Sequence, residues 1–264
     1  MSQSTFKYWT PLCFSMALAL ILGIGAAAGN AAEKPKGYMD PLAVEVLENV
    51  SDHLARAKAF SMKAKTLYDH VLESGVIVTF AKDVALYVQR PDKFLAIISG
   101  DNLSQRRVFF DGKSLVRFDV NKNTYQKLSY EGDIDQLLDY IIDNYDLQLP
   151  LADFIYNDIA NAMKESIISS EYLGERIVGG APCHHLSFES TGADWQLWVQ
   201  KWDKPIPRRF TINYVNIDGN PQYLGMFEEW RLVPGFDERM FTFKPPPGAK
   251  EVELKKAAAS KTVQ

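Results

Sequence analysis

Cysteine is nearly absent from this sequence, whose 264 residues contain only Cys13 and Cys183. Cys13 falls within a predicted leader, so the rest of the chain keeps one cysteine and cannot form an internal disulfide. A single thiol in an exported protein is either buried and unreactive or available for an intermolecular bond. We expect Cys183 to be buried, because free cysteine is among the most buried residue types.

Positive charge is also scarce. The sequence has 29 Lys and Arg against 33 Asp and Glu, a formal net charge of -4. Without the leader, whose one charged residue is Lys7, this becomes -5. The only clustered basic residues are three doublets, at 106–107, 208–209 and 255–256. Nucleic acid is therefore excluded as an expected partner.

Catalytic motifs are missing as well. The chain has no glycine-rich phosphate loop, dinucleotide-binding fingerprint, nucleophile elbow or paired-histidine zinc motif. The one suggestive cluster is Cys183-His184-His185. In a strand, Cys183 and His185 share a face and His184 points to the other, which leaves too few convergent ligands for zinc and no third group to orient a nucleophile. We predict no catalytic residue, no metal site and no cofactor, and hence no enzyme.

The sequence has one long apolar run, Leu12–Ala28. A lysine precedes it, and two small-residue segments, 26–28 and 29–31, offer competing cleavage sites. This pattern predicts a signal peptide over residues 1–31 and a periplasmic protein with no stable membrane span after cleavage. The alternative is an uncleaved anchor, which is disfavoured because the run is shorter than the roughly 20 residues that cross a bilayer.

We predict a polar linker over residues 32–39 and one domain over residues 40–248. Residues 249–264, which follow a run of three prolines, are expected to form a flexible tail. Asp40 and Pro41 suit the first positions of a helix, and apolar residues at helical spacing predict that it runs over 41–59. Alternating apolar and polar residues then predict about six strands between residues 60 and 129, with a hairpin at Asp111-Gly112.

Helical spacing returns in the middle of the chain. Asp133 is the expected N-cap of a helix, and a shorter helical segment follows Pro150. About five more strands are expected between residues 167 and 243. The first of these two helical segments has a wide apolar stripe, made by Ile134, Leu137, Leu138, Ile141, Ile142 and Tyr145.

Residues 195–202 would be apolar on both faces of a strand. Trp195, Leu197 and Val199 would point one way, and Trp198 and Trp202 the other. Together with the segregation of strands and helices, this predicts an α+β fold whose antiparallel sheet curves around helices in its concave face.

Seven short segments resemble the predicted periplasmic protein family of unknown function numbered 2092. They are Met39–Pro41, Phe109–Lys113, Leu149–Asp153, Cys183–Leu186, Asp194–Trp198, Pro205–Arg208 and Phe243–Ala249. That family is similar in turn to the superfamily of the lipoprotein carriers LolA and LolB and the mycobacterial lipid-binding lipoproteins. The resemblance implies an open half-barrel of about eleven antiparallel strands over a helical lid, with acyl chains held between them. It implies no catalytic residue.

The expected ligand-lining residues follow from this architecture. On the neighbouring strands 209–217 and 222–232, the large apolar side chains are expected to form one continuous face. Whether this face meets helices or a ligand is open. The predicted lining residues are Phe210, Ile212, Tyr214, Leu224, Met226, Leu138 and Ile141.

Three functions are ranked on these grounds. The first is a non-enzymatic periplasmic carrier or binding protein for a lipid, lipoprotein or other hydrophobic ligand. The second is an envelope protein-interaction module with a filled core and no ligand. The third is an enzyme that uses Cys183 and His185.

Overall fold

The computed structural model describes residues 37–145, 151–164 and 166–254, with the side chain of Lys164 excluded. The predicted signal peptide, its cleavage sites and most of the predicted linker lie outside these residues. None of the helices in the described ranges has the length and apolar content that a membrane span needs.

Helix α1 spans Pro41–Ala55. The Asp40 side chain accepts a hydrogen bond from the Leu42 N–H at 3.0 Å, and Pro41 occupies the first turn, as the sequence predicted. The helix ends four residues before the predicted Ala59. The intervening residues form the turn that leads into the first strand, which begins at Ala59.

Six strands follow as an antiparallel meander, which confirms the predicted number. They are β1 Ala59–Val71, β2 Ile77–Gln89, β3 Lys93–Gly100, β4 Gln105–Phe110, β5 Ser114–Asp119 and β6 Thr124–Ser129. Gly112, in the predicted hairpin turn, has φ +83°, a conformation that favours glycine.

The middle helices are α2 Ile134–Asn144, the 3₁₀ turn η1 Ala152–Phe154 and α3 Ile159–Lys164. Asp133 and Gln136 form a capping box at the start of α2. The buried stripe of α2 is Ile134, Leu137, Leu138 and Ile141. Ile142 is 65% exposed, so its predicted place in this stripe is wrong, because it lies a further 100° around the helix from Ile141.

Five strands form the second meander, again as predicted. They are β7 Ile167–Val178, β8 Ala181–Ser190, β9 Ala193–Gln200, β10 Pro207–Asn213 and β11 Gln222–Val233.

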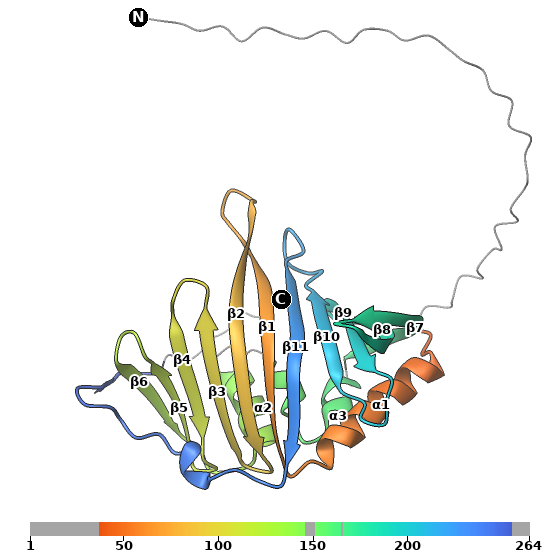
Figure 1. The fold of residues 1–264 in the computed structure, drawn as a ribbon. Helices are drawn as coiled ribbons and strands as arrows, with labels where there is room; N and C mark the ends of the chain where they lie inside the picture. The colour runs from red at the N-terminus through yellow and green to blue at the C-terminus, as the bar shows by residue number, and fades with distance from the viewer. Residues whose placement is uncertain (1–36, 146–150, 165, 255–264) are drawn as a thin grey trace, which may run out of the picture. The chain divides into compact units, whose positions relative to one another are not determined.

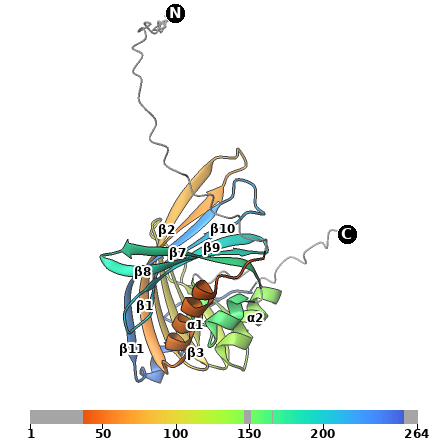
Figure 2. The ribbon, with the colours of Figure 1, turned by 90° about the vertical axis from the view of Figure 1, so that its right-hand side faces the viewer.

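The two meanders form one sheet because β11 pairs antiparallel with β1. The strand order is β12-β6-β5-β4-β3-β2-β1-β11-β10-β9-β8-β7, and its two ends do not pair with each other. The sheet curves around the helices, which lie in its concave face (Figures 1 and 2). The predicted α+β half-barrel is therefore confirmed.

Side chains alternate between the two faces of this sheet. Trp195, Leu197 and Val199 of β9 belong to the main core on the concave side, whereas Trp198 belongs to a separate small cluster. The predicted two-sided character of this strand is confirmed for Trp198. It is wrong for Trp202, which lies beyond the end of β9 and is 58% exposed.

Two side chains fasten the helices to each other and to the sheet. The Arg90 guanidinium, just after β2, donates to the Ile155 carbonyl at 3.1 Å and to Asn157 Oδ1 at 2.7 Å. Burial lowers the pKa of Arg90 to about 10. Ser51 of α1 accepts a hydrogen bond from the Ala160 N–H of α3 at 2.9 Å. The helical layer is thus held by polar contacts as well as by apolar packing.

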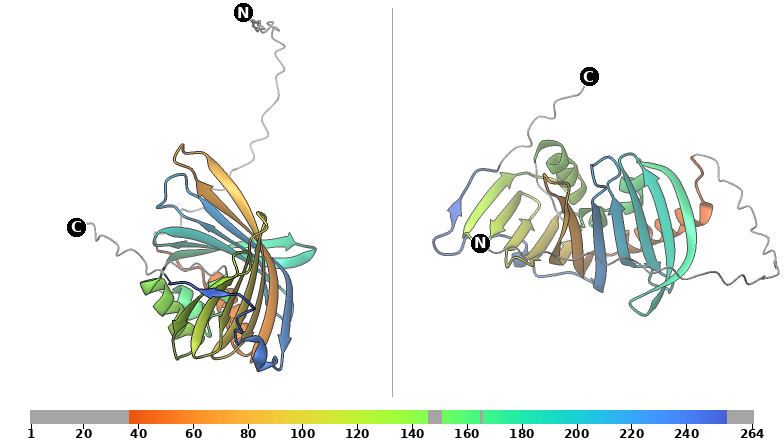
Figure 3. Two further views of the ribbon diagram at one scale, coloured as in Figure 1. Left: turned by 90° about the vertical axis from the view of Figure 1, so that its left-hand side faces the viewer. Right: turned by 90° about the horizontal axis from the view of Figure 1, so that it is seen from above.

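The chain continues past β11 along the opposite, convex face of the first meander (Figure 3). Phe236 packs edge-on against Tyr87, and the short helix η2 Glu238–Met240 precedes the fully buried Phe241. Phe243 lies within 5.4 Å, centroid to centroid, of three rings, those of Phe109, Phe118 and Tyr125. We call residues 234–249 the strap.

The strap leads into strand β12 Lys250–Glu251, which pairs parallel with β6. The predicted end of the domain at residue 248 is therefore too early, because the backbone of Lys250 to Val252 completes hydrogen bonds at the edge of β6. At the opposite edge, Met39 forms an isolated bridge with Ser170 of β7. Both edges of the sheet thus have some of their exposed hydrogen-bonding groups covered.

The strap predicts a stability effect. Phe241→Ala should lower the free energy of unfolding by about 3–5 kcal/mol, because it leaves a cavity beneath the strap. Urea denaturation measures this loss. The control Val252→Ala, at an exposed position just after β12, should change it by less than about 0.5 kcal/mol. Equal effects of the two variants would show that the strap is not packed as described.

Candidate ligand-binding site

Among the described residues, side chains of α2 and η1 pack against the concave face of the sheet. Phe154 of η1 packs edge-on against Phe210 of β10, with ring centroids 5.1 Å apart, and against Phe227 of β11 at 4.9 Å. Leu138 and Ile141 of α2 belong to the same core cluster, and they and Phe210 are at most 3% exposed. A ligand would reach these three predicted lining residues only if the helices moved away.

The register of β10 and β11 separates the other predicted residues. Phe210 lies opposite Gly225 and Ile212 opposite Tyr223, whereas Leu224 and Met226 lie opposite Thr211 and Arg209. Since residues directly opposite each other point to the same face, Leu224 and Met226 are on the convex side. The predicted single apolar face over both strands is therefore wrong.

Met226 instead packs on a small convex cluster that consists of Val178, Ala181, Cys183 and Trp198. Cys183 is free and fully buried, as expected, and burial raises the pKa of its thiol. His185 stacks on Trp198 with centroids 4.1 Å apart and bonds Gln196 through Nε2 at 2.8 Å.

His184 points to the other face, where Nδ1 lies 3.0 Å from the Tyr172 hydroxyl. The predicted split of the Cys-His-His cluster between two faces is thus confirmed. No group of three His, Cys, Asp or Glu side chains in the described ranges is arranged to hold a metal ion.

One cleft lies between α1 and the ends of β8 and β9, with a volume of about 310 Å³. Its lining includes His53, Arg56, His184, Lys201 and Trp202. Burial and neighbouring cations lower the pKa of both histidines. Arg56 pairs with Asp52 and Lys201 pairs with Glu175, so both cations already have partners.

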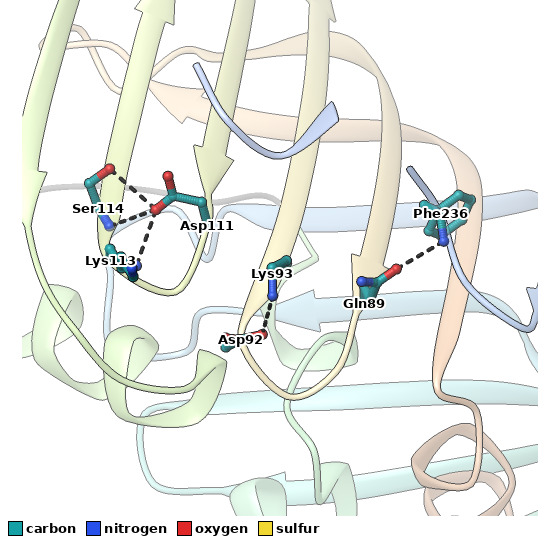
Figure 4. A network of polar contacts seen from close by, with 7 residues as sticks. All are labelled: Gln89, Asp92, Lys93, Asp111, Lys113, Ser114 and Phe236. Carbon is teal, nitrogen blue, oxygen red and sulfur yellow. Dashed lines mark hydrogen bonds and ion pairs between the residues drawn. The ribbon is translucent and has the colours of Figure 1, made fainter. Parts of the chain in front are cut away.

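A second cleft, of about 810 Å³, lies among the turns at the lower end of the first meander, as drawn in Figure 1. Figure 4 shows its polar contacts. Asp111 Oδ1 accepts hydrogen bonds from the backbone of Lys113 and Ser114, and Lys93 pairs with Asp92 at 3.1 Å. Nearby, Gln89 accepts the Phe236 N–H of the strap at 2.9 Å. These carboxylates stabilise the turns around the cleft, so we interpret the cleft as part of the fold and not as a binding site.

A different surface lies at the other end of the concave face, beyond the helices (Figure 1). The concave face of β1 continues from Phe60, Met62 and Ala64 to Thr66 and Tyr68, and across the sheet Tyr68 lies opposite Phe80 of β2 and Tyr223 of β11. Phe80 is 39% exposed and its neighbours are partly exposed. We call this the upper concave surface; its residues are Tyr68, Phe80, Lys82, Ile212, Tyr214 and Tyr223.

One cation lies on this surface. The Lys82 ammonium sits 4.0 Å from the centroid of the Tyr68 ring, which is within the range of a cation–π contact. Burial lowers the pKa of Lys82 and Arg106 lowers it further, whereas Asp101 opposes them. A half-buried ammonium favours an anionic group as its partner.

One carboxyl group lies on η1 beside the same surface. Asp153 is exposed to solvent, yet desolvation raises its pKa, and its charge helps to raise the pKa values of Tyr214 and Tyr223. Asp153 therefore places a negative charge close to two tyrosines of the upper concave surface.

Two predicted lining residues, Ile212 and Tyr214, belong to this surface. Tyr68, Phe80, Lys82, Asp153 and Tyr223 were missed. The sequence of β1 did contain a signal for these residues. The alternation of side chains that begins at Phe60 places Thr66 and Tyr68 on the same face as the core residues, beyond the apolar part of that face.

The family comparison matches this chain over residues 43–255 to a family described as predicted periplasmic protein, DUF2092. The chain belongs to this family. A search of curated proteins finds no match.

Among solved structures, the chain is similar to an uncharacterized conserved protein from Thermus thermophilus. The identity is 13%, the TM-score 0.46, and the match covers 80% of this chain and 99% of the other. It is also similar to MucB (13%, TM-score 0.44, 78% and 64%) and to the Mycobacterium tuberculosis lipoprotein LppX (12%, TM-score 0.40, 75% and 100%). These likenesses are too distant to assign a function to the family.

The buried histidines predict a dependence of stability on pH. Burial is the largest cause that lowers the pKa of His185 below its ordinary 6.5, so the unfolded chain binds more protons than the folded chain just below pH 6.5. The stability that His185 contributes is therefore complete above that pH and is lost as the pH falls. Urea denaturation at several pH values should show a weaker decrease for His185→Asn than for the unchanged protein. Parallel curves would contradict this.

Proposed function

We propose that the protein is a non-enzymatic periplasmic binding protein for an amphipathic, lipid-like ligand. The ligand lies on the upper concave surface, with its apolar part against Tyr68, Phe80, Ile212 and Tyr223 and an anionic head near Lys82. The observation that supports the proposal is the set of partly exposed aromatic and aliphatic side chains that continues the core face beyond the helices.

The energetics suit a ligand that is bound and released. Burial of an acyl chain contributes about 0.8 kcal/mol for each methylene, and ordering of ligand and protein opposes this by about 4–15 kcal/mol. The upper concave surface covers only part of such a chain, so binding is moderate. A carrier needs this property, because it must give up its cargo.

The apolar part of the site is tested with N-phenyl-1-naphthylamine, a neutral probe that fluoresces in apolar surroundings. Ile212→Asp should weaken probe binding at least about tenfold, because it places a charge on the apolar surface. Thr211→Asp is the matched control on the convex face of the same strand and should leave binding unchanged. Equal binding by both variants, or no binding by the unchanged protein, would overturn the proposed site.

The charged part of the site is tested by comparing two probes. Lys82→Met should weaken binding of the anionic 1-anilinonaphthalene-8-sulfonate by about tenfold and should leave the neutral probe nearly unaffected, because only the anion loses its partner. Fluorescence titration measures both affinities. Equal losses for the two probes would mean that Lys82 shapes the surface and does not contact the head group.

A protein-interaction module is the second candidate, and the close packing of the described helices on the sheet favours it. It predicts that native mass spectrometry of gently purified protein finds no lipid and that neither probe binds. A defined envelope protein would then be recovered as a stoichiometric partner.

A further inference from the structure

Exposed aliphatic side chains gather at the upper end of the half-barrel. The connections β1–β2, β3–β4, β5–β6 and β10–β11 lie there (Figure 1). Their exposed apolar residues, which we call the tip residues, are Leu72, Val76, Ile77, Leu103, Val215 and Ile217. Their exposure ranges from 40% for Leu72 to 83% for Leu103.

The two longest connections are held together. Asp69 of β1 accepts a hydrogen bond from the Thr79 hydroxyl at 2.6 Å and another from the Gln222 N–H at 3.0 Å. Gly219 of the β10–β11 connection has φ +83°, and a β-carbon there would lie 3.2 Å from Val71. The tip residues of these hairpins are therefore presented together as a fixed array.

The third tip has an unusual residue for its backbone. Leu103 adopts φ +64° in a turn closed by the hydrogen bond from the Gly100 N–H to the Ser104 carbonyl. Glycine and asparagine favour this conformation, whereas leucine adopts it with strain. The Leu103 side chain does not pack in the core, since it is 83% exposed. Its exposed position suits a contact with another molecule.

The turns at the other end of the first meander differ from these tips. They carry charged residues where the tips carry aliphatic ones: Asp92, Lys93, Asp111, Lys113, Glu131 and Asp133. The four connecting segments 69–79, 100–104, 120–123 and 214–221 contain four carboxylates and one cation, Lys122. This end of the molecule thus presents apolar groups with a net negative charge, which gives no attraction to an anionic surface.

We propose that the tip residues insert into a zwitterionic lipid bilayer surface. A bilayer favours separate apolar projections, because it needs no complementary shape. A protein partner needs a continuous complementary patch of about 800 Å² on each side, whereas these residues stand on separate turns. The net negative charge of the four connecting segments selects zwitterionic over anionic lipid.

This docking brings the upper concave surface to the membrane. Phe80, at its border, lies on the same hairpin as Leu72, Val76 and Ile77. An amphipathic ligand would then pass between bilayer and protein without crossing water. This consequence rests on the proposed function, but the docking itself does not.

The test is flotation of the purified chain with phosphatidylcholine vesicles. Val76→Glu combined with Ile217→Glu should lower the fraction of vesicle-bound protein at least about tenfold. The matched control is Ile142→Glu combined with Ile177→Glu, at positions that are 65% and 71% exposed elsewhere on the molecule, and it should bind as the unchanged protein does.

Leu103→Asn separates docking from folding. Asparagine suits the backbone of that turn, so the urea midpoint should be equal or higher while vesicle binding falls. Adding phosphatidylglycerol to the vesicles should not strengthen binding. The proposal is overturned if the unchanged protein fails to float, if binding requires anionic lipid, or if both double variants bind equally. Loss of naphthylamine binding with flotation intact would refute the proposed function and leave the docking in place.

Discussion

The pairing of β1 with β11 is the contact on which the rest of the structure depends. It joins strands from the two ends of the domain and so converts two meanders into one sheet. Because β1 pairs with β2 on one side and β11 on the other, its concave residues lie in the middle of the curved face. Phe60, Met62 and Ala64 meet the helices there, and Thr66 and Tyr68 continue beyond them. The core and the upper concave surface are thus two parts of one strand face.

The helices divide this face according to side-chain chemistry. Where α2 and η1 lie, apolar side chains are fully buried, and Phe154 fills the space between Phe210 and Phe227. Beyond them the face becomes aromatic and partly exposed, with Lys82 on one side and Asp153 on the other. Among the described residues, the exposed part of this concave face therefore lies beyond the helices, at one end of the sheet. Our proposal places the hydrophobic ligand at that end.

Local patterns predicted most elements, because strand alternation, helix spacing and caps are properties of neighbouring residues. The six and five strands, the Asp133 cap and the two faces of residues 183–185 were all expected from the sequence. The faces of Leu224 and Met226 were not, since they depend on how the 214–221 connection sets the register of β11 against β10. The strap was missed because its aromatic contacts join residues that are more than a hundred positions apart. Tyr68 and Lys82 were missed because the site is assembled by the β1–β11 pairing.

Photolabelling tests the central claim most directly. A fatty acid with a diazirine on its acyl chain is bound to the purified protein, activated by light and located by peptide mass spectrometry. We expect labels on the upper halves of β1, β2, β10 and β11, at or next to Tyr68, Phe80, Ile212 and Tyr223. The claim would be contradicted by labels confined to the convex face or to the cleft between α1 and β9. It would also be contradicted by labelling no stronger than that of a denatured sample.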